Sequence, residues 1–338
     1  MPNYFLELPL IERSEILSKL STLPEVNRSE TILEKDLWIC WALETLFNMP
    51  DRLSMAFKGG TSLSKVFNVI HRFSEDIDLT ISYDEFCDKD IFASTISRAQ
   101  LKKITQDIKI KVAKHINDII IPYFNEIISL QFKNKNLKII SGDDGETIYI
   151  EYQSTASNKD NYITGNIKLE FGGRNIITPN SLHEITADVQ PYLKELVFPV
   201  PKIPVLSAEK TFWEKMTLIH YECHRDKIKM NANRISRHWY DIAKLYKDPI
   251  GQSAIKKIEL LHSVIQIKKA FYHASYANYD ACLNGGFKLI PSEAGLRQLK
   301  VDFNKMIDNQ MFYNEEIQFV EVINQIRELE EIINSTVK

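Results

Sequence analysis

Apolar residues recur at helical spacing over three long stretches in the first 130 positions. Residues 10–22 and 29–49 each carry the apolar face of an amphipathic helix. Residues 91–129 read as one long helix or two broken ones, with Pro122 as the interruption because proline cannot donate a helical hydrogen bond. The pattern predicts a largely helical start, apart from the stretch between residues 50 and 90.

That intervening stretch combines a glycine turn, a helix and a strand. A glycine pair precedes residues 63–70, where apolar side chains return at helical spacing. Residues 76–81 then alternate with period two, which places Asp76 and Asp78 on one face of a strand and apolar side chains on the other. Two like charges on one strand face repel each other, so this arrangement calls for a ligand that holds them together.

The remainder of the chain changes from strand to helix character. Alternating apolar residues predict strands at 137–140, 147–153, 163–171 and from 184 onward. Three prolines between positions 199 and 204 exclude a helix there. Helical spacing predicts helices from about 207 to 224 and from about 234 to 246, and a helical bundle over 252–278, 293–309 and 314–335. We therefore expect an α+β fold, with a sheet domain at 1–203 and an all-helical domain at 204–338.

Composition and charge narrow the class of protein. The 338 residues are 44% hydrophobic and 26% charged, as in ordinary folded proteins, and the formal charge of −3 gives no overall attraction to nucleic acid. Four cysteines show no paired spacing, and no apolar run reaches the roughly 18 residues of a membrane span. We expect a soluble, cytoplasmic protein without a membrane partner, whose contacts with RNA would depend on local basic patches.

The glycine turn and the acidic strand together suit phosphate and metal chemistry. Gly59 and Gly60 let the backbone approach a ligand, and Thr61 and Ser62 follow as donors to phosphate oxygens. Mg²⁺ takes hard oxygen ligands, often one or two carboxylates completed by substrate phosphates, as an Asp-x-Asp strand can supply. Taken singly, each half could be a plain turn or a solvated acidic edge. Their order and spacing favour nucleotidyl transfer.

The sequence KGGTSLSK followed by RFSEDIDL resembles the first motif of the DNA polymerase β-like nucleotidyltransferase superfamily, and more narrowly the AbiEii/AbiGii and Men toxin family. The resemblance implies a polymerase β-like domain with a mixed sheet flanked by helices, Mg²⁺ or Mn²⁺ as cofactor, and an NTP as substrate. Its nucleotide-binding positions here are Lys58, Gly59, Gly60, Thr61, Ser62 and Ser74, together with Lys215.

The superfamily also places a third carboxylate on a strand beside the Asp-x-Asp strand, and Glu170 in Leu-Glu-Phe matches that slot. This match implies that Asp76, Asp78 and Glu170 hold the metal. Lys168 lies on the same strand face as Glu170. The alternative is an exposed Lys–Glu pair on a two-faced strand.

Two later segments resemble further family motifs. They implicate Lys215, in the middle of a helix, and Asp241, which follows an aromatic residue on the next helix. Lys215 can neutralise triphosphate oxygens as a compact charge, and Asp241 can hold that lysine or meet the sugar. The alternative is a salt bridge between two packed helices. The Glu34-Lys35-Asp36 triplet also resembles the family, although such a triplet alone most often forms a solvated helix face.

Two basic stretches are candidates for RNA contact. The first choice is 224–238, and the second is the lysine-rich helix around 98–114, where a solvated face is the simpler reading. His220, Cys223 and His224 suggest zinc only weakly, because a fourth ligand and a tighter pattern are missing.

The function that these observations favour is metal-dependent transfer of a nucleotidyl group from an NTP to an acceptor. The family resemblance implies a bacterial toxin of a toxin–antitoxin or phage-defence system. Such a toxin adds nucleotides to the 3′ end of tRNA, blocks translation and has a cognate antitoxin. A nucleotidyltransferase acting on a small molecule or a protein is one alternative. A catalytically silent nucleotide-binding regulator is another, and the intact Asp76, Asp78 and Glu170 speak against it.

Overall fold

The computed structural model describes residues 4–132, 136–156, 165–225, 234–313 and 316–337 and divides into two compact units. The first unit contains Met1–Val66, Phe73–Asp88 and Ile104–Val205, and the second contains Phe67–Arg72, Lys89–Lys103 and Leu206–Lys338. The predicted domain boundary after residue 203 stays a prediction. The contacts show in addition that two short segments from early in the chain pack with the second unit.

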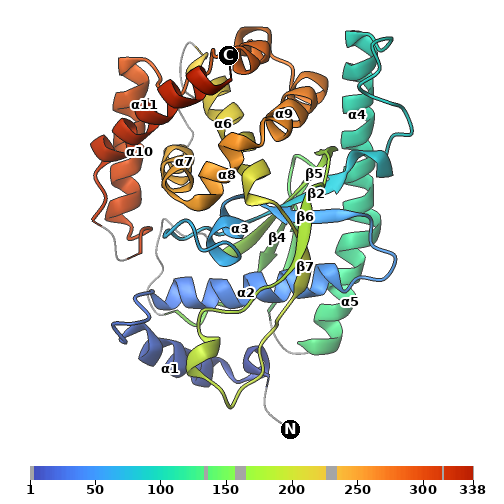
Figure 1. The fold of residues 1–338 in the computed structure, drawn as a ribbon. Helices are drawn as coiled ribbons and strands as arrows, with labels where there is room; N and C mark the ends of the chain where they lie inside the picture. Colours follow the sequence, from blue (N-terminus) through green and yellow to red (C-terminus); the bar gives the residue numbers. More distant parts are fainter. Residues whose placement is uncertain (1–3, 133–135, 157–164, 226–233, 314–315, 338) are drawn as a thin grey trace. The chain divides into compact units, whose positions relative to one another are not determined.

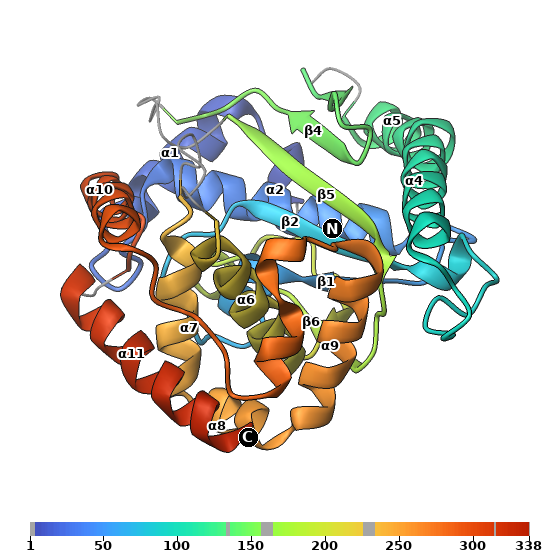
Figure 2. The ribbon, with the colours of Figure 1, turned by 90° about the horizontal axis from the view of Figure 1, so that it is seen from above.

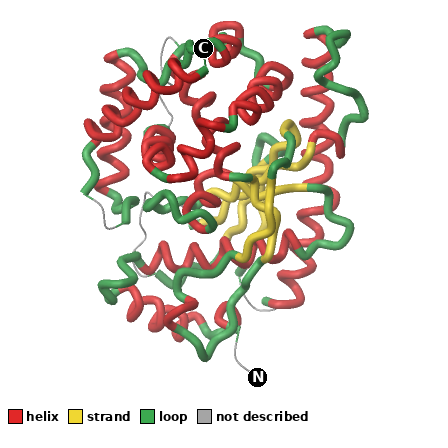
Figure 3. The backbone as a smooth tube through the Cα atoms, viewed as in Figure 1, coloured by secondary structure: helices red, strands yellow, loops and turns green. Residues whose placement is uncertain are grey.

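The first unit is built on a seven-stranded mixed sheet (Figures 2 and 3), in the order β3-β4-β5-β2-β1-β7-β6. The strands are β1 (Met55–Lys58), β2 (Asp76–Ser82), β3 (Lys138–Ser141), β4 (Thr147–Glu151), β5 (Asn166–Asn175), β6 (Asn180–Glu184) and β7 (Lys202–Leu206). β2 is parallel to β5 and β1 is parallel to β7, whereas β1–β2, β3–β4 and β4–β5 are antiparallel. This mixed sheet with its helices confirms the predicted α+β class.

One strand prediction was wrong. Residues from 184 onward were expected to begin a strand, but β6 ends at Glu184, and Gln190–Tyr192 form a 3₁₀ turn. Pro191 lies at the start of that turn, where its fixed φ favours a turn and its missing N–H would weaken a sheet. The proline-rich stretch instead supplies β7, which pairs with β1 through Phe57 and Val205.

Helices α1 (Leu10–Ser21), α2 (Glu30–Phe47), α3 (Gly59–Lys65), α4 (Arg98–His115) and α5 (Ile121–Gln131) accompany this sheet. The Ser29 side chain accepts a hydrogen bond from the Ile32 N–H and caps α2. α4 and α5 follow one another as a rod in Figure 1, joined by a single π-helical segment, Ile116–Ile120. Pro122 causes this local change of winding instead of ending the helix.

Three consecutive charged residues on α2 are buried, contrary to the solvated face that the triplet alone indicated. The Glu34 carboxylate accepts hydrogen bonds from the hydroxyls of Ser154 and Thr155 and from the Thr155 N–H. Lys35 forms an ion pair with Glu75 that excludes almost all solvent. Because a buried charge is tolerated only when it is paired, these contacts fix α2 against the residue that precedes β2.

Asp36 completes the row. Its carboxylate binds the Lys65 ammonium at 2.6 Å and accepts the Asp188 N–H at 2.7 Å. Lys65 also binds the Asp188 carboxylate at 2.7 Å, so one cation at the end of α3 serves two anions. Burial and the charge of Asp188 raise the pKa of Asp36 to about 6, against the attraction of Lys65. The glycine-turn helix is thereby tied to α2 at its far end.

The second unit is helical in its larger part. It contains α6 (Ala208–Cys223), α7 (Arg237–Lys247), α8 (Pro249–Lys256), α9 (Ile258–Phe271), α10 (Glu293–Asp308) and α11 (Phe319–Thr336). α6 packs against α7, α8 and α9, and α7 packs against α11. Ser207 caps α6 as its sequence position indicates. No described helix is both long and apolar enough to cross a bilayer.

His220 on α6 is buried and uses both ring nitrogens. Nε2 lies 2.7 Å from the Ala277 carbonyl oxygen, and Nδ1 accepts the Lys288 N–H at 3.0 Å. Burial, together with the charge of His224, lowers the pKa of His220 from 6.5 to about 4. A histidine held neutral in this way has no lone pair left for a zinc ion.

We predict that the Lys35→Met substitution lowers the free energy of unfolding by about 3–5 kcal/mol, because Glu75 is left buried without its cation. Equilibrium urea unfolding measures the loss. The double variant Lys35→Met/Glu75→Gln should recover most of it, and Lys19→Met, at an exposed position, should change little. A single variant as stable as the wild type would contradict the anchoring role.

We also predict that His220 makes the folded state acid-sensitive. Because its pKa is lowered in the folded state, its contribution is complete above pH 6.5 and is lost as the pH falls toward 4, by up to about 3 kcal/mol. Unfolding free energies measured from pH 7 to 4 should therefore fall less steeply in His220→Gln than in the wild type. The exposed His262→Gln should retain the wild-type slope, and equal slopes in all three proteins would refute the prediction.

Candidate active site

Three adjacent strands of the first unit align one charged residue each. Lys58 at the end of β1 faces Asp78 on β2, and Asp78 faces Glu170 on β5. Partners in register lie about 5 Å apart between Cα atoms, so their side chains are neighbours on one face. Asp76 and Asp78 are half-buried, while Ile77 between them is fully buried. The predicted acidic and apolar faces of the strand are both present.

Gly59 is the point at which the glycine turn meets the acidic strand. Its φ is +84°, and a Cβ placed there would lie 1.9 Å from the Asp78 Oδ2 atom. A side chain is therefore excluded by both the backbone conformation and the neighbouring carboxylate. The turn thus packs its main chain directly against Asp78, while Gly60 is buried within α3.

The hydroxyl groups behind the turn stabilise it from within. Thr61 is buried and donates to the Asp76 carbonyl oxygen at 2.5 Å, and its hydroxyl lies 3.1 Å from the Ser74 oxygen. The Ser62 hydroxyl donates to the Gly59 carbonyl at 3.0 Å. Thr61 and Ser74 therefore connect α3 to the segment that enters β2, whereas Ser62 bonds within the glycine turn.

Glu170 lies beside Asp78 in register, but its carboxylate pairs with Lys168 at 2.5 Å. Lys168 in turn faces Asp76 across the two strands. Burial by itself would lower the pKa of Lys168. The hydrogen bond and the attraction from Glu170, to which Asp76 adds, outweigh burial, so the pKa of Lys168 is raised. The face therefore carries three carboxylates and two lysines, and the Lys–Glu pair that was the alternative reading of Glu170 is present within it.

The donor set suits a magnesium ion that uses two protein carboxylates. Among the residues that the structure describes, no group of three or more His, Cys, Asp or Glu side chains could hold a metal. Asp76 and Asp78 share a face and are partly accessible, and Mg²⁺ is commonly bound by one or two carboxylates plus substrate phosphates. Glu170 would join them only after separating from Lys168.

The two remaining predicted site residues, Lys215 and Asp241, belong to the second unit and contact each other there. Lys215 on α6 binds the Asp241 carboxylate on α7 at 2.9 Å. The same carboxylate receives two hydrogen bonds from Arg72, each at 2.7 Å, in a bidentate arrangement. Arg72 and Asp241 are almost completely buried, and Lys215 is 8% exposed.

The charges in this cluster alter one another. Burial alone would raise the pKa of Asp241, but the attraction of Arg72 and then of Lys215 lowers it below its ordinary value. Burial lowers the pKa of Lys215, Asp241 opposes this, and the nearby positive charges of Arg72 and Arg237 reinforce it. Asp241 is thus firmly ionised and is the group that keeps Lys215 charged.

Sequence reasoning missed Arg72, Lys65 and Glu75 as members of these networks. Arg72 and Glu75 lie within the RFSEDIDL motif, and Lys65 ends KGGTSLSK. The signal in the sequence was the presence of these three residues inside the motifs themselves.

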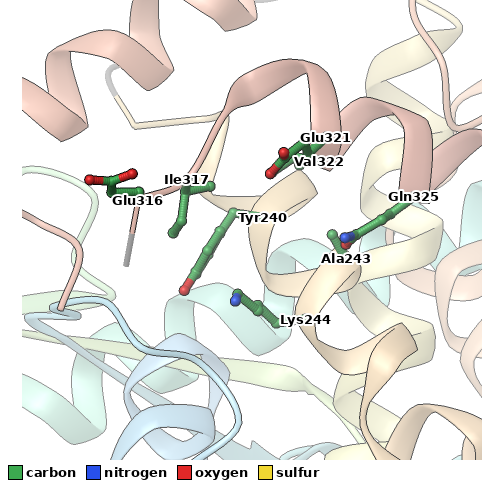
Figure 4. A pocket seen from close by; sticks show the side chains of 8 residues that line it. All are labelled: Tyr240, Ala243, Lys244, Glu316, Ile317, Glu321, Val322 and Gln325. Carbon is green, nitrogen blue, oxygen red and sulfur yellow. The ribbon is translucent and has the colours of Figure 1, made fainter. Parts of the chain in front are cut away.

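A small cavity of about 250 Å³ lies in the second unit between α7 and the start of α11 (Figure 4). Tyr240 and Lys244 line it from α7, and Glu321 and Gln325 line it from α11. It contains none of the predicted site residues. Of the preferred RNA-contact stretch, residues 226–233 lie outside the described part of the chain.

A protein-family model covers most of this chain. The model of a family described as "Nucleotidyl transferase AbiEii toxin, Type IV TA system" matches residues 41–328. The solved structure of the nucleotidyltransferase toxin MenT4 from Mycobacterium tuberculosis H37Rv is similar over 96% of this chain and 99% of its own, with a TM-score of 0.47 and 14% identity. No curated protein matches the chain.

We predict that Gly59→Ala lowers activity toward NTPs by about a hundredfold, because the added methyl group must displace the Asp78 carboxylate and small misplacements of reacting groups have such effects. Steady-state rates and melting temperatures should be measured together. Gly165→Ala is the matched control, since its added Cβ meets no atom within 4 Å. Equal activity of the two variants would show that the Gly59–Asp78 contact is dispensable.

Proposed function

The chain belongs to the AbiEii nucleotidyl transferase toxin family of type IV toxin–antitoxin systems, and on that premise we propose that it transfers nucleotides from an NTP to RNA, at the 3′ end of tRNA. Membership makes it a nucleotidyltransferase toxin and implies a cognate antitoxin. The RNA acceptor and the blocking of translation are our proposal. The observation that carries the nucleotidyl-transfer chemistry is the alignment of Lys58, Asp78 and Glu170 beside a turn that excludes any side chain at Gly59.

In this proposal Asp76 and Asp78 hold Mg²⁺ or Mn²⁺, with Glu170 as a third ligand or as the group that orients the attacking hydroxyl. When bound, the metal supplies Lewis-acid polarisation of the phosphoryl oxygens. Glu170 is in register with Asp78, which supports this assignment. Its ion pair with Lys168 would have to open, and the partly exposed position of both side chains permits that.

The glycine turn binds the triphosphate in this scheme. Gly59 and Gly60 present main chain without side chains, and Lys58 adds a positive charge beside Asp78. Because the single Thr61 proton is donated to the Asp76 carbonyl, Ser74 donates to Thr61 and would exchange that bond for one to a substrate oxygen. The Ser62 hydroxyl would first exchange its bond to Gly59 for one to phosphate.

Lys215 offsets the charge that develops on the leaving pyrophosphate, and Asp241 orients it. Charged donors aimed at developing negative charge are among the largest contributions to catalysis. The ion pair between Lys215 and Asp241 supports this division of roles, since Asp241 is fully buried and Lys215 retains some exposure.

We predict that the purified protein, incubated with total bacterial tRNA, Mg²⁺ and each labelled NTP in turn, places label on tRNA with one NTP. Asp76→Asn should reduce labelling at least about a hundredfold, because it removes a charge from the metal-binding pair without changing side-chain size. Asp84→Asn, which neutralises an exposed aspartate, should label as the wild type does.

Other outcomes of this labelling experiment would decide between the alternative functions. No label on any RNA, with every NTP, would exclude an RNA acceptor. Label on a protein or a small molecule of a cell extract would identify the alternative acceptor class, and tight NTP binding without any transfer would indicate a silent regulator.

A further inference from the structure

The buried cluster of the second unit contains two cations for one anion. Both Asp241 carboxylate oxygens are engaged by Arg72, through its Nε and Nη2 atoms, and Lys215 shares Oδ2. With all three groups ionised, the cluster carries a net charge of +1. A Lys–Asp pair alone would be neutral, and its lysine would present little positive potential to a ligand.

We propose that Arg72 is a positioning residue for nucleotidyl transfer, which neutralises Asp241 so that Asp241 can orient Lys215 without cancelling the charge that Lys215 offers to the triphosphate. This inference rests on the proposed function of Lys215. It adds a residue that acts through Asp241 and does not itself touch the substrate.

The burial of the three side chains supports this order of roles. Arg72 is 1% exposed, Asp241 is 0% exposed and Lys215 is 8% exposed, so Lys215 is the member that solvent reaches. An ammonium has three donors, and the bond to Asp241 leaves others for substrate oxygens. Arginine suits the inner place because its guanidinium stays protonated and matches a carboxylate bidentately.

The charges around Lys215 also support the role of Asp241 in keeping Lys215 protonated. Burial lowers the pKa of Lys215, and Asp241 is the group that raises it again. Outside the three members, whose charges sum to +1, the positive charge of Arg237 also acts on Lys215, whereas His238, whose pKa burial lowers well below its usual value, adds no charge.

Arg72 also lies in a segment fixed by its backbone, so a purely structural role must be separated from the electrostatic one. The His71 N–H donates to the Tyr240 hydroxyl, and Tyr313 N–H donates to the His71 carbonyl at 2.8 Å. Arg72 itself forms a bridge with Phe312. These main-chain contacts do not require the guanidinium and should survive its replacement.

The test measures binding of ATP, GTP, CTP and UTP with Mg²⁺ by calorimetry, together with melting temperatures. Arg72→Gln should weaken binding of the preferred NTP by about ten- to a hundredfold, the range of a lost charge-assisted contact. Arg72→Gln/Asp241→Asn removes one charge of each sign and restores the net charge of the cluster, so it should bind more tightly than Arg72→Gln. Arg297→Gln, whose arginine is exposed, is the control and should bind as the wild type does.

Wild-type binding by Arg72→Gln, or a double variant no better than Lys215→Met, would overturn the inference. If Arg72→Gln does not fold, the comparison of the double variant with Lys215→Met still decides. Because NTP binding needs no acceptor, the expected pattern of affinities without RNA labelling would leave the inference standing while the proposed acceptor fails. If Arg72→Gln labels RNA and binds NTPs as the wild type does, the proposed function stands and the inference about Arg72 fails.

Discussion

The pairing of buried charges on helix α2 is the constraint on which the first unit depends. Glu34, Lys35 and Asp36 are nearly inaccessible, and each meets a different segment of the unit. Since an unpaired ion in such a place is far more costly than a lost apolar contact, the partners have little freedom to move. Lys35 holds the residue before Asp76, and Asp36 holds the end of the helix that begins at Gly59.

Buried charges are also paired in the second unit, but the numbers of cations and anions differ. There, one carboxylate serves an arginine and a lysine, whereas in the first unit one lysine, Lys65, serves two carboxylates. At Lys65 the charges balance, because Arg28 also pairs with Asp188 at 3.5 Å. At Asp241 the two cations that bind the carboxylate leave one positive charge in excess, for which a triphosphate would be the complementary ligand.

The geometry of the candidate site was more predictable from the sequence than the networks that support it. Period-two alternation predicted the two faces of β2, and the family motif pointed to Glu170, which lies in register with Asp78 and whose role stays a prediction. The burial of Glu34, Lys35 and Asp36 could not be read from one sequence, because a charged triplet looks the same whether its partners are water or distant side chains. The strand expected after residue 184 failed for a related reason, since its alternation held no information about a neighbouring strand.

The segment Phe67–Arg72 packs with the second unit, although the chain on both sides of it belongs to the first. The helical part that begins at Leu206 is therefore not a self-contained cassette, because Asp241 would lose its bidentate partner if that part were separated. Gene fusion or domain exchange at the apparent boundary would transfer a buried carboxylate without its arginine. The two pieces of chain must therefore stay in one polypeptide for the buried carboxylate to keep its partner.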